Sequence, residues 1–370
     1  MSLPCLPRRQ LIKGLAMASL AGGLPSSLFA TPREAVGRSL GVALVGLGYY
    51  SRELLAPGLQ LTRNCHLAGI VTGSPQKALA WQRQYDLPDR NIYDYGDFDR
   101  IADNPDIDVV YVVLPNHLHK PFTLRAAAAG KHVWCEKPMA MNAAEGQAMI
   151  DACQRNRVKL AIGYRMQHEP NTQQMIGFAR DRPYGELRSL QCDAGFNAFD
   201  DAEGTDNWRL DPARGGGAMY DMGVYSLNAA RYASGEEPVA VTARQSVQRP
   251  NIFKGVDETM HFDLEFPSGL LSRCSTSFGK NMNLLRAEAE RGWYELSPFQ
   301  SYDGIRGSTS DGLVLDARVP HQQALQMDND AKSIIDDSPM RVPGEEGVRD
   351  LRVVDAIFRS VAEGGRVTIG

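Results

Sequence analysis

The feature that most constrains the fold is a glycine turn placed between a buried strand and a helix. Residues 40–45 read Leu-Gly-Val-Ala-Leu-Val, and Gly46-Leu47-Gly48 follows at once. An uninterrupted apolar run is typical of a strand buried on both faces of a parallel sheet. Glycines after it let the helix N-terminus approach a pyrophosphate. The pattern predicts a dinucleotide turn, with Gly46 in the tight bend, Gly48 beside the phosphates and Ser51 in the third, small position.

The same alternation continues along the first half of the chain. Further strands are expected at 66–71, 107–114, 131–136 and 159–163, and helices at 54–59, 77–85, 122–129 and 141–155. Strands alternating with helices predict a doubly wound parallel sheet, an α/β Rossmann domain over 40–163. The 370 residues leave room for a second domain over 164–370. Strands are predicted there at 187–192, 239–247, 258–266, 270–277 and 288–296.

The end of the second strand selects between the two nicotinamide dinucleotides. NAD sites usually carry an acid there, which holds the ribose 2′-hydroxyl. This chain has no acid between Glu53 and Asp86, and it places Thr72, Ser74 and Lys77 at that point. Hydroxyl groups and an ammonium suit a 2′-phosphate, so we predict NADP. The alternative is that Lys77 is an ordinary solvated helix residue.

The N-terminus has the three parts of an export signal. Arg8 and Arg9 precede Leu11-Ile12-Lys13, an apolar stretch rich in glycine and alanine follows, and a cleavage site is expected after Ala30. We interpret 1–30 as a twin-arginine signal peptide and 31–39 as a short arm. The alternative is a chance arginine pair. The signal predicts that the twin-arginine machinery exports the folded protein to the periplasm, so NADP must be carried inside it without dissociating and be reoxidised in place by a second substrate.

Bulk composition limits the classes of partner and metal site. A net charge of −4 gives no reason to expect nucleic acid or an anionic membrane, and the leader is too short for a membrane anchor. Five cysteines remain beyond Cys5, without a Cys-x-x-Cys pair, so we expect free thiols. The close pair His117 and His119 has no evident third ligand, and no metal is predicted.

Three residues suggest proton chemistry. Lys137 follows a predicted strand at the carboxyl edge of the sheet, where ligands of doubly wound folds bind. Asp221 and Tyr225 are four positions apart and would share one face of a helix. A tyrosine ionises near pH ~10, so a neighbouring cation such as Lys137 would be needed to make it a base. The alternatives are a surface lysine, a helix cap and a packed core aromatic.

Several motifs together resemble the glucose–fructose oxidoreductase family, which includes inositol dehydrogenases. They are Leu114-Pro-Asn-His-Leu-His119, Glu136-Lys137-Pro138, Gly215-Gly-Gly217, Asp221 and Tyr225. The likeness runs from residue 40 to the C-terminus and is strongest to the periplasmic glucose–fructose oxidoreductases, which share the leader, the Ser/Lys phosphate site and the tyrosine. It implies a C-terminal α/β domain with a large, open, mostly antiparallel sheet. It also implies homo-oligomers; the short arm favours a homodimer, and a tetramer stays open.

The resemblance also implies an activity and residue roles. The enzyme would oxidise an aldose at C1 to the aldonolactone and then reduce a second sugar to an alditol, in ping-pong fashion. Tyr225 would be the acid/base, tuned by Lys137, while Asp221 orients the sugar. Glu136 would hold the nicotinamide ribose or Lys137. Gly46 and Gly48 and the predicted 2′-phosphate ligands Thr72, Ser74 and Lys77 belong to the cofactor site. The resemblance adds further cofactor-binding residues: Tyr49, Tyr50, Tyr95, Leu114, Asn116, His119, Glu136, Lys137, Arg165, Trp208 and Arg209.

Two other functions remain open from the sequence. One is a conventional NADP-dependent sugar dehydrogenase with an exchangeable cofactor. The other is a non-catalytic sugar sensor on the same fold. We expect substrate choice to depend on residues 167–169 and 196–206, and glucose–fructose and aldose–aldose pairs are both compatible with the residues.

Overall fold

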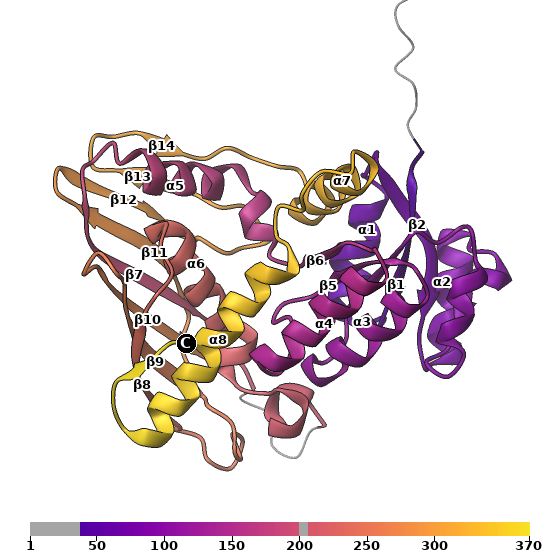
Figure 1. Cartoon of the computed structure of the whole chain (residues 1–370), viewed down its shortest axis with the longest axis horizontal. Coiled ribbons are helices and arrows are strands. Elements are labelled where there is room, and N and C mark those ends of the chain that lie inside the picture. The colour runs from indigo at the N-terminus through magenta and orange to yellow at the C-terminus, as the bar shows by residue number, and fades with distance from the viewer. Residues whose placement is uncertain (1–37, 200–205) are drawn as a thin grey trace, which may run out of the picture. The chain divides into compact units, whose positions relative to one another are not determined.

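The computed structural model describes residues 38–199 and 206–370. The proposed signal peptide (1–30), most of the proposed arm (31–39) and part of the segment 196–206 lie outside the described residues. The described chain contains two sheets, one of six strands and one of nine. Figure 1 shows how the helices are arranged around them. The α/β class expected from the sequence is confirmed.

The first sheet is parallel throughout, in the order β3-β2-β1-β4-β5-β6. This is the strand order of a dinucleotide-binding Rossmann fold. Its strands are β1 (Leu40–Val45), β2 (Cys65–Val71), β3 (Ile92–Tyr93), β4 (Val109–Val112), β5 (His132–Cys135) and β6 (Leu160–Ile162). Five of them match predicted strands to within three residues at each end. The sequence did not predict β3, because two residues are too few to show a period.

Two helices of this half, α2 and α4, begin at a polar capping residue. The side chain of Ser74 accepts a hydrogen bond from the backbone of Lys77 at the start of α2, and Asn142 does the same for Glu145 in α4. The helices are α1 (Ala56–Leu59), which follows a π-helical turn at Ser51–Leu55, α2 (Pro75–Tyr85), α3 (His119–Ala128) and α4 (Ala143–Arg155).

The second sheet is mostly antiparallel, as predicted. Its order is β14-β13-β12-β11-β7-β10-β9-β8-β15, and only the β7–β10 pair is parallel among the strands described. The strands are β7 (Leu187–Gly195), β8 (Ala240–Ser246), β9 (Thr259–Glu265), β10 (Leu271–Ser277), β11 (Met282–Ala289), β12 (Gly292–Leu296), β13 (Gly307–Thr309), β14 (Val314–Leu315) and β15 (Val367–Thr368).

The single strand predicted at 288–296 is wrong. The chain turns at Glu290 and Arg291, and β11 and β12 form a hairpin in which Ala289 pairs with Gly292. Gly292 has φ +151°, and a Cβ there would lie 2.1 Å from the Ser310 hydroxyl, so the turn requires glycine. Residues that favour strand lie on both sides of the turn, so the sequence pattern predicted one continuous strand.

Helices cover one face of the second sheet. α6 (Val224–Ser234) packs on β7, β10 and β11, and α8 (Gly344–Glu363) packs on β8. Accordingly Met260, Phe262 and Leu264 of β9 are buried, whereas Asp263 on the opposite face is exposed. α5 (Pro170–Asp181) contacts α6 and β12. Among the described elements, we find no helix on the face that carries Asp263.

The C-terminal part of the chain also packs against the first sheet. α7 (Gln322–Ile335) places Met327 in the same apolar core as Leu44. The backbone N–H of Ile162 in β6 donates to the carbonyl of Val342 at 2.9 Å. From there α8, yellow in Figure 1, runs past β6 and α4 to the second sheet. These contacts hold the carboxyl edge of the first sheet beside the elements that carry Asp221 and Tyr225.

In residues 38–199 and 206–370, no helix combines the length and apolarity that a bilayer crossing needs. The five cysteines in this part of the chain are buried free thiols.

Candidate active site

The glycine turn has the geometry that a dinucleotide requires. Gly46 has φ +94°, and a Cβ there would lie 2.3 Å from the carbonyl oxygen of Val113, so the position requires glycine. The would-be Cβ of Gly48 meets no atom within 4 Å, which leaves open space at the helix N-terminus. The buried Ser51 hydroxyl donates to the Gly46 carbonyl at 2.6 Å and fixes the turn from behind. The turn therefore fits a pyrophosphate.

Lys77 reaches back to this turn. Its Nζ donates to the carbonyl of Leu47 at 3.2 Å, while the Ser74 N–H donates to the Thr72 hydroxyl at 3.3 Å. The Tyr95 ring lies against Gly73, where a Cβ would stand 3.2 Å from the ring. An ammonium and two hydroxyls thus gather where β2 ends.

Lys137 lies between the two residues expected to act with it. It follows β5, and its peptide bond to Pro138 is cis. Its Nζ donates to the backbone carbonyl of Asp221 at 2.7 Å and lies 3.7 Å from that residue's carboxylate. The same ammonium stands 4.6 Å from the centroid of the Tyr225 ring. The structure therefore brings Lys137, Asp221 and Tyr225 together, as the sequence predicts.

Asp221 is a buried carboxylate that remains ionised. Burial opposes its ionisation, but Arg209 and Lys137 outweigh burial and hold the pKa of Asp221 below its usual value. The Arg209 Nε donates to Asp221 at 2.9 Å, and the guanidinium lies over the Trp208 ring at 4.5 Å from its centroid. Arg209 and Trp208 are thus placed at the site by Asp221.

The cation in contact with the Tyr225 phenol oxygen is not the one that the sequence predicted. The group that donates to its phenol oxygen is Arg165, through Nη1 at 3.0 Å, whereas Lys137 lies over the ring. Burial raises the pKa of Tyr225, and Arg165 opposes this rise. The sequence predicted that Lys137 lowers the pKa of Tyr225, but it did not predict that Arg165 contacts the phenol oxygen and also lowers this pKa.

The Gly215–Gly217 motif shapes the approach to α6. Gly217 has φ +104°, and a Cβ there would lie 2.1 Å from the Asp257 carboxylate, which accepts the N–H of Met219 at 2.7 Å. Asp221 lies in a π-helical turn, Met219–Gly223, directly before α6. Asp221 therefore lies in a π turn and Tyr225 in the first turn of α6. The sequence had predicted that both residues lie in one unbroken helix.

Asn116 and His119 connect loops. Asn116 donates through Nδ2 to the Gly215 carbonyl at 2.8 Å. The two ring nitrogens of His119 lie 2.8 Å from the carbonyl oxygens of Leu114 and Pro138, and burial lowers its pKa to about 4. His119 thus joins the loop after β4 to the loop that presents Lys137, and neither ring nitrogen is left for a ligand.

The Glu136 carboxylate is fixed by two hydrogen-bond donors. The Tyr111 hydroxyl donates to it at 2.7 Å, and the backbone N–H of Lys137 donates at 3.3 Å. A Cβ at Gly163 would lie 2.6 Å from this carboxylate, so glycine makes room for it. Burial raises the pKa of Glu136. Of the two roles predicted for Glu136, the contact with Lys137 is present, and it is made through the backbone.

Sequence reasoning missed several residues of the site. Besides Tyr111 and Gly163, Gln322 accepts from the Arg165 Nε at 3.1 Å, and the Tyr302 ring lies 4.5 Å from the Arg165 guanidinium and 6.1 Å from the Tyr50 ring. Tyr302 lies in an irregular segment between β12 and β13, which shows no periodic pattern. Tyr49 is 65% exposed and has no place in this cluster.

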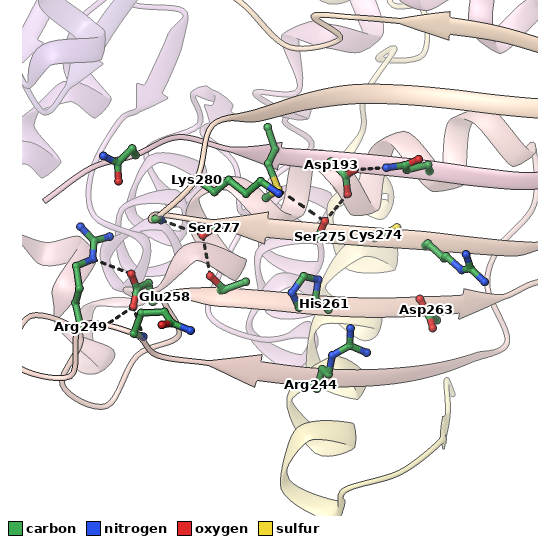
Figure 2. A pocket seen from close by; sticks show the side chains of 17 residues that line it. Asp193, Arg244, Arg249, Glu258, His261, Asp263, Cys274, Ser275, Ser277 and Lys280 are labelled. Atoms are coloured by element: carbon green, nitrogen blue, oxygen red, sulfur yellow. Dashed lines mark hydrogen bonds and ion pairs between the residues drawn. The ribbon is translucent and has the colours of Figure 1, made fainter. Parts of the chain in front are cut away.

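A cavity of about 810 Å³ lies elsewhere, on the bare face of the second sheet. Figure 2 shows Asp193, Arg244, His261, Asp263 and Lys280 around it, with charges of both signs. This cavity contains none of the predicted site residues. In the described ranges, no group of three or more His, Cys, Asp or Glu side chains is placed to hold a metal ion.

Comparisons with known proteins agree with this architecture. Residues 40–164 match the model of an oxidoreductase family with an NAD-binding Rossmann fold, and residues 173–294 match the GFO/IDH/MocA C-terminal domain. The crystal structure of an aldose–aldose oxidoreductase from Caulobacter crescentus is 41% identical, with a TM-score of 0.85, and the match covers 90% of this chain and 100% of that one.

More distant relatives share the fold. The D-xylose 1-dehydrogenase [NADP(+)] of Haloarcula marismortui is 25% identical over 326 residues, which cover 86% of this chain and 90% of that protein. A levoglucosan dehydrogenase solved with NADH and L-sorbose is 20% identical, with a TM-score of 0.79 and coverage of 90% and 99%. With both parts of the chain matched and a relative 41% identical over its full length, the protein belongs to the GFO/IDH/MocA family of oxidoreductases.

Proposed function

We propose that this protein is an NADP-dependent sugar oxidoreductase that oxidises an aldose at C1 to the aldonolactone and reduces a second sugar to an alditol. The observation that carries the proposal is the position of the Lys137 ammonium, between Asp221 and Tyr225 at the carboxyl edge of the Rossmann sheet. The Caulobacter relative is an aldose–aldose oxidoreductase, and curated relatives from Haloarcula and Haloferax are named as NADP(+) xylose dehydrogenases.

The residues at the glycine turn fit NADP. Gly46 permits the tight turn and Gly48 leaves room for the pyrophosphate, while Lys77, Ser74 and Thr72 supply donors for a 2′-phosphate. An acid at the end of β2 would repel that phosphate, and none is present before Asp86. When bound, the nicotinamide supplies the hydride chemistry.

Proton transfer falls to the side chains around Tyr225. Oxidation at C1 removes a hydride from carbon and a proton from the hydroxyl oxygen. Tyr225, as phenolate, takes that proton, and as phenol it returns the proton to the carbonyl oxygen of the second sugar. Lys137 donates a hydrogen bond to the reacting oxygen, and Asp221 accepts one from a sugar hydroxyl. All three side chains converge, which favours catalysis over the alternative of a sugar sensor.

The export signal predicted from the sequence would place the enzyme in the periplasm. A periplasmic enzyme has no pool of free NADP, so we propose that the nucleotide stays bound through successive turnovers. The alternative is a conventional dehydrogenase with an exchangeable cofactor. Incubation of the loaded protein with labelled NADP separates the two, because a retained nucleotide does not exchange during many turnovers.

The experiment that tests the activity uses two sugars and no added nucleotide. Purified protein is given one aldose, then a second sugar, and lactone and alditol are quantified. Equal amounts of both products, in large excess over enzyme, are expected. Lactone that stops at one equivalent per protein and resumes only when NADP is added would support the conventional dehydrogenase instead.

We also propose that the protein is a homodimer joined through the bare face of the second sheet. Figure 2 labels Arg244 and Lys280 beside Asp193 and Asp263, and Arg273 also lines this face. Charges of both signs allow a self-complementary contact around a two-fold axis. Light scattering should give twice the mass of one chain, and Arg273→Glu should give monomers, while Arg180→Glu on exposed α5 should not. A monomeric wild-type protein would contradict this proposal, and a mass four times that of one chain would indicate the tetramer.

A further inference from the structure

Arg165 is a buried cation without a carboxylate partner. It is 1% exposed and stands just after β6, at the start of a short 3-10 turn, Arg165–His168. Its Nε donates to Gln322 and its Nη1 to the Tyr225 oxygen, both uncharged groups. Its Nη2 is buried and has no acceptor in the described structure. Within residues 38–199 and 206–370, we find no ion pair between Arg165 and an acid.

The buried positive charge of Arg165 would be stabilised by a nearby anion. Arginine stays protonated in proteins, so Arg165 cannot escape burial by losing its proton. A buried charge without a counter-charge is costly. The Tyr225 oxygen lies 3.0 Å from Nη1 and gains a negative charge when the phenol ionises. The Glu136 carboxylate is near enough for Arg165 to favour its ionisation, but no ion pair joins the two in the described structure, so phenolate formation would place a negative charge in direct contact with the guanidinium.

The other charges around Tyr225 do not replace Arg165. The Lys137 ammonium lies over the ring and is already engaged by the carbonyl and carboxylate of Asp221. The Asp221 and Glu136 carboxylates oppose ionisation of the phenol. The remaining titratable or charged neighbours are Tyr50, Tyr302 and Arg209. Arg209 acts on Tyr225 from a distance and is paired with Asp221, whereas Arg165 donates a hydrogen bond to the phenol oxygen.

The frame around Arg165 holds this geometry. Gln322 fixes its Nε and in turn donates to the Ser301 carbonyl at 3.0 Å, and the Tyr302 ring stacks on the guanidinium. Two residues on, Gln167 donates to Asn228 of α6 at 2.9 Å and so joins the turn to the helix that carries Tyr225. The distance between Arg165 and Tyr225 is therefore set by contacts on both sides.

We propose that Arg165 is a positioning residue that orients Tyr225 and stabilises its phenolate as an unsolvated ion pair. This inference rests on the proposed role of Tyr225 as acid/base. When the phenol O–H bond breaks, its electron pair stays on the oxygen opposite Nη1, and the proton passes to the carbonyl oxygen of the sugar being reduced. In the oxidising half-reaction the phenolate recovers a proton from the C1 hydroxyl.

The test compares Arg165→Met with Arg165→Lys in the full-length, nucleotide-loaded protein. Tyrosinate absorbance is titrated, and the Tyr225→Phe spectrum is subtracted to isolate Tyr225. Arg165→Met should raise the apparent pKa of Tyr225 by about one to three units, the effect of an opposite charge within ~4–6 Å. Arg165→Lys should raise it less, because it keeps the charge but loses the planar fork. The pH profile of single-turnover sugar oxidation should shift in the same order.

Controls keep the result interpretable. Arg180→Met removes an exposed arginine from α5, with a side chain 76% exposed, and should shift neither titration. If Arg165→Met does not fold, Gln322→Met loosens the Arg165 Nε and should give a smaller upward shift. An unchanged Tyr225 titration in the folded variants overturns the role of Arg165 while leaving the proposed function intact. Full turnover in Tyr225→Phe would instead overturn the proposed acid/base, whatever the titrations show.

Discussion

The Lys137 ammonium holds Asp221 at two points, by a 2.7 Å hydrogen bond to its backbone carbonyl and by a 3.7 Å approach to its carboxylate. Lys137 follows β5 of the first sheet, whereas Asp221 lies in the π turn before α6, 84 positions along the chain. One side chain thus sets the position of the π turn that precedes Tyr225 and supplies a charge at the site. Removing it should affect both geometry and chemistry.

Lys137→Met should lower kcat for sugar oxidation by about 10²-fold or more, because proton handling at a reacting oxygen contributes factors of ~10²–10⁴. Steady-state kinetics with a saturating aldose measure the effect. Lys332→Met is the matched control, since Lys332 is exposed on α7 and its ion pair is with Asp336, far from these site residues in the sequence. Equal activities in the two variants would remove Lys137 from the mechanism.

Lys77→Gln should weaken NADP binding while leaving NAD binding nearly unchanged. A hydrogen bond to a charged group contributes about 1.5–3 kcal/mol, so a loss of about 10- to 100-fold in affinity for NADP is expected. Nucleotide is first stripped from the protein, and binding of each dinucleotide is then measured by calorimetry. A parallel loss for both dinucleotides would mean that Lys77 contacts the shared pyrophosphate and does not select for the 2′-phosphate.

Gly217→Ala should destabilise the protein and displace Asp221. The new Cβ would meet the Asp257 carboxylate at 2.1 Å, in a backbone conformation with φ +104° that alanine rarely adopts. Strain of this kind costs about 1–3 kcal/mol. Gly177→Ala is the control, because Gly177 lies within α5 with open space around it and should gain up to about 1 kcal/mol. Thermal unfolding distinguishes the two, and equal stability of both variants would refute the clash.

A buried pair should make stability depend on pH. Burial raises the pKa of Asp330 to about 8 and lowers that of His168 to about 3, and the two side chains approach to 3.8 Å without exposure. Between pH ~4 and 8 the native Asp330 keeps a proton that the unfolded chain releases, so its contribution to the free energy of unfolding falls as pH rises. His168 acts oppositely, but only below its unfolded pKa of about 6.5. The free energy of unfolding is therefore expected to fall from pH ~6.5 to 8.

Asp330→Asn should abolish that loss. The wild-type free energy of unfolding should fall relative to the variant by up to about 1.4 kcal/mol per pH unit over this window. Denaturant unfolding at several pH values measures the difference between the two proteins. Parallel stability curves would show that Asp330 is already ionised in the native state.

The Rossmann half was predictable because its signals are local. The apolar run of β1, the glycines after it and the Ser74 cap of α2 each act within a few residues of the chain. The strand end at Lys137 and the spacing of Asp221 and Tyr225 are local as well, but the roles of these three residues were predicted from the family resemblance. The hairpin at Gly292 was missed because its residues favour strand on both sides of the turn.

Contacts between distant segments were not predictable. The Arg165–Tyr225 hydrogen bond joins residues 60 positions apart, and Gln322 lies 157 positions from Arg165. No period or spacing in the sequence reports such a pair, since it depends on how α7 packs against the first sheet and α6 against the second. For this reason the cation at the phenol oxygen emerged only from the structure.

The account depends on Tyr225 exchanging the proton of successive sugars over a nucleotide that stays bound. The most direct measurement gives wild-type and Tyr225→Phe proteins, both loaded and without free nucleotide, an aldose followed by a second sugar. The wild type should form lactone and alditol in equal amounts over many turnovers, and the loaded variant should form neither. Sustained product from the variant, or a wild type that needs added NADP for each turnover, would contradict it.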